Sequence, residues 1–254
     1  MTKVSKTPKA EIFNEGTTNP NPTFDVNQRF EFLSQLSEMV VENKTASLLV
    51  TGEGGLGKTY TVNETVNKLM DNDDDKIQEQ VKVIKGYSTP RGLYNTLYDN
   101  NGKLIIFDDC DSVLKNDVSL NPLKGALDSY DERIISWSAQ ARGDDDYPRR
   151  FEFTGRIIFI SNKKKEKIDQ AVLSRCMVVD VSMTPAEKIE RMRTVLKFVC
   201  PELPMSTKEE SLDLIDKHKE NIKDLNFRTL IKVSKIKHSF PDNWEGLATY
   251  AMFG

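Results

Sequence analysis

The chain has 254 residues, of which 38% are hydrophobic and 30% are charged, a composition typical of a soluble globular protein with one large domain, alone or with a small companion. Its net charge of −3 at pH 7 argues against a protein that coats nucleic acid by bulk electrostatics, although a local basic stripe stays compatible with this charge. The charge does not demand a basic partner either.

The cysteines and the apolar runs bear on the compartment. Cys110, Cys176 and Cys200 have no metal-ligand spacing, and their odd number suits free thiols in a reducing compartment. No apolar run approaches the roughly 18 to 20 residues of a membrane span, and the polar start lacks the core of a signal peptide. We therefore expect a cytoplasmic protein with no membrane partner, located in the host cytoplasm if the chain is viral.

The beginning of the chain changes character at Asp25. Residues 1–24 are polar, contain Pro8, Pro20 and Pro22, and show no hydrophobic periodicity, so they predict a tail. From Asp25 onward, apolar residues at helical spacing predict an amphipathic helix. Its expected core residues are Phe32, Leu33, Leu36, Met39 and Val40.

A glycine-rich stretch, Gly52 to Thr59 (GEGGLGKT), follows an apolar run at 47–50 and precedes an amphipathic helix. A strand, a glycine turn and a helix in this order form a phosphate-binding loop, because the glycines let backbone N–H groups face the phosphates and the helix adds its positive end. Lys58 would reach the terminal phosphates, and the Thr59 hydroxyl would hold Mg²⁺. The alternative, a turn that merely joins strand to helix, needs only one or two glycines. The expected nucleotide-binding residues are Gly52, Glu53, Gly54, Gly55, Leu56, Gly57, Lys58, Thr59 and Tyr60.

The helix after this loop should bury Val62, Val66, Leu69 and Met70 on one face. The acidic run at 71–75 then predicts a solvated connection. A second strand is expected from Val81 to Lys85. Thr89 and Pro90 predict the cap and first turn of a helix that carries Leu93, Leu97 and Tyr98.

A third buried strand, Leu104 to Phe107, runs directly into Asp108 and Asp109. Two carboxylates at this place suit a nucleotide-hydrolysing site, in which Asp108 would orient the Mg²⁺ shell and Asp109 would polarise the attacking water. The alternative is that the acidic pair simply starts a loop.

Another apolar strand, Arg156 to Ile160, is followed by Asn162. If this strand lies beside the one that ends in Asp108, Asn162 can hydrogen-bond the γ-phosphate or the attacking water. Asparagine is also a common turn former, which is the alternative. Because strands and helices alternate along the chain, we predict a parallel, doubly wound sheet with right-handed crossovers.

Arg175 closes the segment IDQAVLSR, just before an apolar strand at 177–181. It has no obvious partner within the chain. We therefore expect Arg175 to reach the γ-phosphate of a neighbouring subunit.

An insertion precedes the strand that leads to Asn162. Two segments, 133–138 and 150–153, predict the strands of a hairpin with a polar tip at 139–149. The arginines at and beside this tip would attract a phosphate backbone, whereas Asp144 to Asp146 would repel it. The charge pattern thus leaves DNA, protein or no partner open for the hairpin.

The C-terminal part predicts a small helical lid. Thr184, Pro185 and Glu187 combine an N-cap, a first-turn proline and a capping-box acid, and further helices are expected at about 207–219 and 226–240. Arg228 lies in the first turn of the last helix, where the helix dipole disfavours a cation. We expect the bound nucleotide to be its partner.

Taken in order, GEGGLGKT, LIIFDD, IIFISN, LSRC and NFRTL resemble the AAA+ family of ring ATPases over roughly Val26 to Phe240. The matching positions would be Walker A (Lys58, Thr59), Walker B (Asp108, Asp109), sensor 1 (Asn162), the arginine finger (Arg175) and sensor 2 (Arg228). The Ser-Arg-Cys triplet is similar to that of clamp loaders, the Asp-Asp pair and the strand-ending asparagine resemble helicase superfamily 3, and the chain as a whole looks like small single-module AAA+ ATPases of tailed phages. The family usually has Glu where this chain has Asp109, so hydrolysis is expected to be slow unless the backbone compensates.

This resemblance implies an α/β P-loop NTPase fold with a nucleotide-binding core at 25–183 and a helical lid at 184–254. It also implies ATP and Mg²⁺ as cofactors and self-assembly into a homo-oligomeric ring, expected to be a hexamer. Three functions stay open: a DNA-directed motor or loader in replication or recombination, a remodeller that threads a polypeptide past Tyr87, and a slow nucleotide-gated switch.

Overall fold

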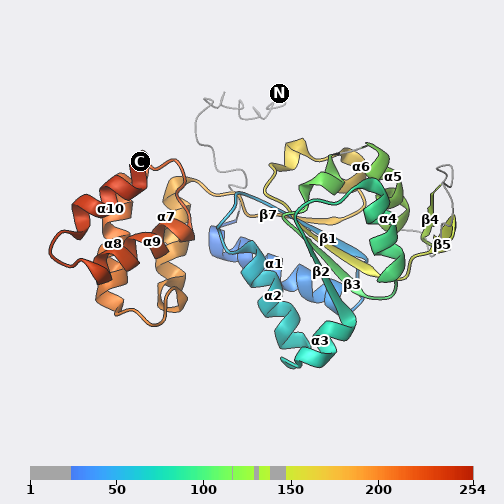
Figure 1. Cartoon of the computed structure of the whole chain (residues 1–254), viewed down its shortest axis with the longest axis horizontal. Coiled ribbons are helices and arrows are strands. Elements are labelled where there is room, and N and C mark those ends of the chain that lie inside the picture. Colours follow the sequence, from blue (N-terminus) through green and yellow to red (C-terminus); the bar gives the residue numbers. More distant parts are fainter. Residues whose placement is uncertain (1–23, 116, 129–131, 138–146, 254) are drawn as a thin grey trace, which may run out of the picture.

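The computed structural model describes residues 24–115, 117–128, 132–137 and 147–253. The segment predicted to be a polar tail, 1–24, lies outside the described residues except for Phe24. The main sheet has five strands in the order β2-β3-β6-β1-β7, and each neighbouring pair is parallel (Figure 1). The strands are β1 (Ser47–Thr51), β2 (Val81–Lys85), β3 (Leu104–Asp108), β6 (Arg156–Ile160) and β7 (Met177–Asp180).

The inner residues of the central strands β1, β3 and β6 are apolar on both faces, because helices cover both faces of the sheet. Alternate residues of β3 and β6 belong to two different hydrophobic clusters: Phe107 and Phe159 point to one face, and Ile106 and Ile158 point to the other. The Phe107 and Phe159 rings stack with their centroids 5.4 Å apart. The predicted α/β, parallel, doubly wound architecture is confirmed.

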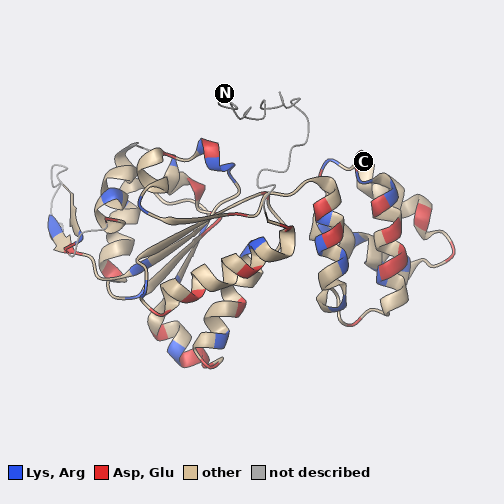
Figure 2. Cartoon of the chain, turned by 180° about the vertical axis from the view of Figure 1, so that it is seen from behind, with Lys and Arg blue, Asp and Glu red and all other residues tan. Residues whose placement is uncertain are grey.

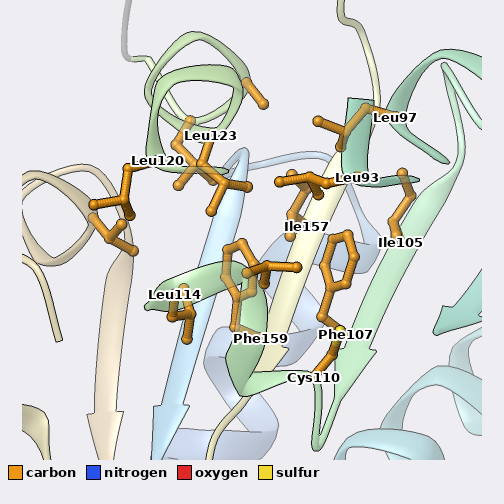
Figure 3. Close-up of a cluster of buried hydrophobic side chains, with 14 of the residues drawn as sticks. Leu93, Leu97, Ile105, Phe107, Cys110, Leu114, Leu120, Leu123, Ile157 and Phe159 are labelled. Carbon is orange, nitrogen blue, oxygen red and sulfur yellow. The ribbon is translucent and has the colours of Figure 1, made fainter. Parts of the chain in front are cut away.

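Helices cover both faces of this sheet. One face packs against α1 (Val26–Val41), α2 (Lys58–Leu69) and the short α3 (Asp74–Gln80). The other face packs against α4 (Pro90–Asp99), α5 (Asp117–Ala126) and α6 (Gln170–Leu173). Figure 3 shows this second core, in which Leu93 and Leu97 of α4 and Leu123 of α5 meet the sheet residues Phe107 and Phe159.

The expected buried face of α1 is partly wrong. Leu33 and Val40 are buried as predicted, but Phe32, Leu36 and Met39 are only half-buried. Helix α1 turns a neighbouring stripe to the core because it also lies against β7 and against the helix at Pro185–Val195 (α7). The buried side chains of α1 are Val26, Arg29, Phe30, Leu33, Ser37 and Val40.

The acidic run at 71–75 is exposed as expected, but it is more than a connection. The Asp73 side chain accepts a hydrogen bond from the Lys76 backbone at 3.1 Å and caps α3, and Asp74 and Asp75 form its first turn. Acidic side chains stabilise a helix N-terminus because they accept hydrogen bonds from its unpaired backbone N–H groups and offset its positive dipole.

The helices α3 and α5 and the last helix, α10 (Trp244–Phe253), were not predicted.

Four C-terminal helices pack around a hydrophobic cluster of their own. They are α7 (Pro185–Val195), α8 (Met205–His218), α9 (Phe227–Ser239) and α10, and they form the group at the left of Figure 1. Figure 2 shows acidic and basic residues interspersed along these helices. The predicted capping box of α7 is present, since Thr184 and Glu187 bond reciprocally.

Helix α7 is also fastened to the sheet-containing part. The Arg29 side chain of α1 is 1% exposed and forms an ion pair with Glu187. Its other terminal nitrogen donates to the Ser182 carbonyl, in the segment that leads into α7. The guanidinium of Arg191 lies 4.2 Å from the centroid of the Phe30 ring. Arg29 and Phe30 of α1 therefore hold α7, the first of the C-terminal helices, against the sheet-containing part.

The predicted hairpin is formed by β4 (Ile134–Ser136) and β5 (Arg150–Glu152), which pair antiparallel. It packs on α4, where the Tyr94 ring meets those of Trp137 and Phe151 at 5.7 and 5.4 Å. Residues 138–146, which include most of the predicted tip, lie outside the described residues. Among the described residues, no helix has the length and apolar character needed to span a membrane.

Candidate nucleotide-binding site

The glycine-rich loop joins the carboxyl end of β1 to the N-terminus of α2. Gly55 and Gly57 have φ of +73° and +94°, in the left-handed region that glycine occupies without strain. Gly57 is the N-cap residue of α2, so the first turn of the helix points its backbone N–H groups at the loop. The local structure is therefore the strand, turn and helix that a phosphate site requires.

A cavity of about 140 Å³ lies over this loop and brings most of the predicted site residues together. They come from the loop, from the ends of β3 and β6 and from the start of α9. Its lining consists of Gly54, Gly55, Gly57, Lys58, Thr59, Tyr60, Asp109, Asn162 and Arg228. Leu56 is different, because its side chain is 1% exposed and belongs to the core, so that only its backbone is available to a ligand.

Lys58 is 4% exposed and folds back onto its own loop. Its ammonium group donates to the carbonyls of Gly52 and Glu53, each at 2.7 Å, and to Asn162 Oδ1 at 2.9 Å. Burial lowers the pKa of Lys58 to about 8, although the nearby carboxylates of Asp109, Asp108, Asp111 and Glu53 oppose this shift. The loop thus holds a buried cation in reach of any phosphate that enters the cavity.

The two residues predicted to hold Mg²⁺ are in contact. Thr59 Oγ1 donates to Asp108 Oδ1 at 2.8 Å, and Asp108 is 4% exposed at the end of β3. A hydroxyl and a carboxylate oxygen at this separation are the ligand types that Mg²⁺ prefers beside phosphates. The donor set fits the ion.

Asp109 and Asn162 also meet, since β3 and β6 are neighbours in the sheet. Asn162 Nδ2 donates to Asp109 Oδ1, and the Asp109 backbone N–H donates to the Ile160 carbonyl at 3.2 Å. Asp109 has a φ of +53°, which is uncommon outside glycine. This bend directs its carboxylate to the cavity over the loop.

The start of α9 rests on the glycine loop. The Phe227 backbone N–H donates to the Gly55 carbonyl at 3.0 Å. A Cβ placed on Gly55 would lie 3.0 Å from the Asn226 side chain, so a larger residue would disturb this contact. Arg228 follows and is exposed at the edge of the cavity.

A larger cleft of about 900 Å³ adjoins the small cavity and shares Gly54, Asn162 and Arg228 with it. It extends between the loop and the C-terminal helices, where Lys188 of α7 forms an ion pair with Glu53. Ligand sites in proteins usually measure about 300 to 1,000 Å³. The space over the loop is therefore large enough for a small organic ligand as well as for its phosphates.

No protein-family model matches the chain. It is 27% identical over 243 residues to an uncharacterised 36.7 kDa protein encoded in the nrdC–mobD intergenic region of Enterobacteria phage T4, and the match covers 88% of this chain and 73% of the phage protein.

Solved structures resemble this one at low sequence identity. NtrX from Brucella abortus in complex with ATP superposes with a TM-score of 0.53 and 12% identity over 85% of this chain and 52% of NtrX. Aeropyrum pernix ORC2 in its ADP form gives 0.52 and 15% over 94% of this chain and 70% of ORC2. Both have the AAA+ P-loop fold. The chain has the AAA+ fold.

A third structure, Aeropyrum pernix ORC1 in complex with DNA, has a TM-score of 0.50 and 13% identity over 89% of this chain and 64% of ORC1. The chain spans about half the length of NtrX. At these identities the likeness concerns the AAA+ fold alone.

Within the AAA+ fold, Arg175 lies away from the other predicted site residues. It precedes β7, and its backbone carbonyl accepts from Ser47 at the start of β1, so it sits at the amino edge of the sheet while the loop sits at the carboxyl edge. A strand of five residues separates the two edges by about 16 Å. The expectation that Arg175 has no partner is wrong in one respect, because its Nη1 donates to the Ala171 carbonyl at 3.0 Å.

Several residues that contact the site were not predicted. Ser161 is fully buried and donates to Asp111 Oδ1 at 2.6 Å, which ties the turn after β3 to the turn after β6. Lys85 Nζ lies 3.4 Å from Asp108 Oδ2. The position of Ser161 directly before Asn162 was the available signal for the first contact, whereas the second follows only from the pairing of β2 with β3.

Proposed function

We propose that this chain is an ATPase of the AAA+ kind that hydrolyses ATP with Mg²⁺. One observation carries the proposal: Lys58, Thr59 and the Asp109–Asn162 pair meet at one cavity over a glycine loop, and Asp108 is bonded to Thr59. These are the cation, the metal ligands and the water-positioning groups that phosphoryl transfer to water uses.

Each residue has a role that follows from its contacts. Lys58 exchanges its bonds to the loop carbonyls for bonds to the terminal phosphates. Thr59 and Asp108 hold Mg²⁺, which, when bound, offsets the negative charge that develops on the phosphates. Asp109 accepts a proton from the attacking water while Asn162 holds the Asp109 carboxylate in place.

The remaining roles concern assembly. We take 25–183 as the nucleotide-binding core and 184–254 as the lid, with Arg228 directed at the bound nucleotide. Arg175, at the opposite edge of the sheet, then serves a neighbouring subunit of a homo-oligomeric ring, which we propose to be a hexamer. An arginine supplied in trans stabilises the charge of the transition state in this way.

We propose that hydrolysis drives a DNA-directed motor or loader. The Ser-Arg-Cys triplet, the hairpin and the Asp-Asp pair favour this function. A second candidate is a protein-threading ATPase, which is favoured by Tyr87: this residue is 78% exposed and follows Gly86 at the carboxyl edge of the sheet. A slow nucleotide-gated switch is the third, because Asp109 is shorter than glutamate.

One experiment separates these functions. The ATPase rate of the chain is measured alone, with single-stranded DNA, with double-stranded DNA and with an unfolded protein, and Lys58→Ala serves as the inactive reference. Stimulation by DNA supports a motor or loader, stimulation by the polypeptide supports threading, and a low rate that no polymer changes supports a switch. A wild-type rate no higher than that of Lys58→Ala would refute the ATPase itself.

Tyr87→Ala refines this experiment. If a polymer passes over Tyr87, the variant should keep its basal ATPase rate and lose the stimulation, because aromatic stacking contributes about 1 to 3 kcal/mol per base. Tyr250→Ala is a suitable control, since Tyr250 is 76% exposed on α10. Equal stimulation of both variants and the wild type would show that the polymer does not depend on Tyr87.

A further inference from the structure

Lys85 makes a contact at the candidate site that the proposed roles do not use. Lys85 ends β2, Asp108 ends β3, and the two residues are directly paired in the register of the sheet. Lys85 Nζ lies 3.4 Å from Asp108 Oδ2, while Asp108 Oδ1 accepts the hydrogen bond of Thr59 at 2.8 Å. Both oxygens of the carboxylate that we assign to the metal therefore have a partner from the chain itself.

The two partners of Asp108 would respond differently to a divalent cation. The Thr59 hydroxyl has lone pairs and remains beside the carboxylate as a ligand. The Lys85 ammonium has only donors, and a divalent cation at the same carboxylate repels it. The Lys85 side chain is 67% exposed, whereas that of Asp108 is 6% exposed, so Lys85 can move into water without leaving its charge buried.

Lys85 directly precedes an exposed loop, so displacement of Lys85 from Asp108 would also affect that loop. Gly86 follows with a φ of +84° and open space around it, and Tyr87 then projects into solvent with 78% of its surface exposed. The Ser88 backbone N–H donates to Ser112 Oγ at 3.0 Å, in the 3₁₀ turn at 111–114 that follows β3. The loop at 86–88 is thus held to β3 and its following turn on both sides of Tyr87.

We propose that Lys85 is a positioning residue that occupies Asp108 in place of Mg²⁺, and that metal binding with the nucleotide displaces it and loosens the loop that carries Tyr87. The inference rests on the proposed function, because it takes Asp108 as a metal-binding carboxylate. Lys85 lowers the metal affinity of the site and makes the loop at 86–88 respond to the metal.

The test measures Mn²⁺ binding in the presence of ADP by electron paramagnetic resonance. The proteins are the wild type, Lys85→Met, Lys85→Arg and the control Lys82→Met, since Lys82 is an exposed lysine of the same strand that pairs in register with Ile105. Because ion pairs with an exposed partner are weak, we expect the Mn²⁺ Kd to fall only about two- to fivefold in Lys85→Met. Lys85→Arg, which keeps the charge, and Lys82→Met should retain the wild-type Kd.

Amide hydrogen exchange of residues 86–89 gives the second measurement. In the wild type, Mg²⁺ with ADP should raise exchange above the level with ADP alone, and in Lys85→Met exchange should be high in both conditions. Equal Mn²⁺ affinity of Lys85→Met and the wild type, or a wild-type loop that ignores Mg²⁺, would overturn the inference while ADP-dependent Mn²⁺ binding sustains the proposed function. No ADP-dependent Mn²⁺ binding in the wild type would overturn both.

Discussion

Lys58 and Asn162 are 104 residues apart in the sequence and are joined by a hydrogen bond of 2.9 Å from Nζ to Oδ1. Since Asn162 also donates to Asp109, one amide group links the buried cation of the glycine loop to the acid at the end of β3. A ligand that draws Lys58 away frees Asn162 Oδ1 for another donor. Ligand binding at the glycine loop and the orientation of Asp109 are therefore coupled through the side chain of Asn162.

The first prediction separates the two partners of this bond. Lys58→Ala should weaken ADP binding by about 10- to 100-fold, because hydrogen bonds to charged groups contribute about 1.5 to 3 kcal/mol. Asn162→Ala should keep most of the affinity and lose about 100-fold in hydrolysis, as removal of a positioned polar group does. Titration with fluorescent ADP and a steady-state ATPase assay measure both effects. Lys68→Ala, at the exposed end of the same helix, is the control, and normal nucleotide binding by Lys58→Ala would exclude the site.

The second prediction is a pH dependence. The pKa of Lys58 is about 8 in the folded protein and 10.5 in an unfolded chain, so the folded state releases its proton first as the pH rises. Below pH 8 the buried charge opposes folding in full, and this penalty is relieved between about pH 8 and 10.5. Nucleotide binding shows the opposite trend because phosphates need the charged form.

The Kd for ADP should therefore rise above pH 8, approaching about tenfold per pH unit. Lys58→Ala should bind weakly with little further change over the same range. The same fluorescence titration, repeated from pH 7 to 9.5 in steps, measures both profiles. A flat profile for the wild type would contradict the role of the Lys58 charge.

The third prediction concerns Asp109. Asp109→Asn keeps the shape of the side chain and loses its charge, so ATP should bind normally and hydrolysis should fall by at least about 100-fold. Quantifying ADP and phosphate from bound ATP in a single-turnover assay checks this result. Unchanged turnover would assign the base to another acid, and Asp111, which accepts from Ser161, is the next candidate.

The fourth prediction tests whether subunits share their sites. Arg175→Ala should bind ATP normally and hydrolyse it slowly, because an arginine acting in trans contributes only to the neighbour's transition state. A mixture of Arg175→Ala with Lys58→Ala should regain activity, since each subunit supplies what the other lacks. Mixing is verified with differently labelled subunits, and a mixture that exchanges subunits but stays inactive would count against shared sites.

The fifth prediction concerns the ion pair between Arg29 and Glu187. Arg29→Met removes the buried cation of the pair and leaves the Glu187 carboxylate, whose side chain is 14% exposed, with its capping-box bonds to Thr184, so the free energy of unfolding should fall by about 3 kcal/mol. Arg193→Met is the matched control, because Arg193 bonds Asp213 and Asp216 on the surface and exposed pairs contribute about 1 kcal/mol or less. Urea denaturation measures both variants, and equal losses would mean that burial adds nothing to the first pair.

The parts of the fold that the sequence predicts are those with a strong local signal. GEGGLGKT specifies its own turn, and the apolar runs that end in Asp108 and before Asn162 specify buried strands. Their adjacency could be proposed because parallel strands place their carboxyl ends at one edge of the sheet. Thr59 and Asp108 meet at this same edge, although β6 lies between β1 and β3.

Other features have no local signal. Arg29 is the one basic residue of α1, and its burial depends on Glu187 in a helix far along the chain. The contact between Lys85 and Asp108 requires the strand register. Helix α10 is apolar on most sides and its hydrophobic residues follow no helical period, so its buried face is set by packing against α9.

The order of the strands has a consequence for synthesis of the chain. β6 lies between β1 and β3 in the sheet, although it follows both in the sequence. Until Arg156 to Ile160 have left the ribosome, β1 and the β2–β3 pair have no strand to join them, and both present apolar strands with unpaired edges. Such edges pair readily with other chains. We therefore expect the nascent protein to be most vulnerable to aggregation before β6, the fourth strand of the main sheet, emerges, and its candidate nucleotide-binding site cannot form before that moment.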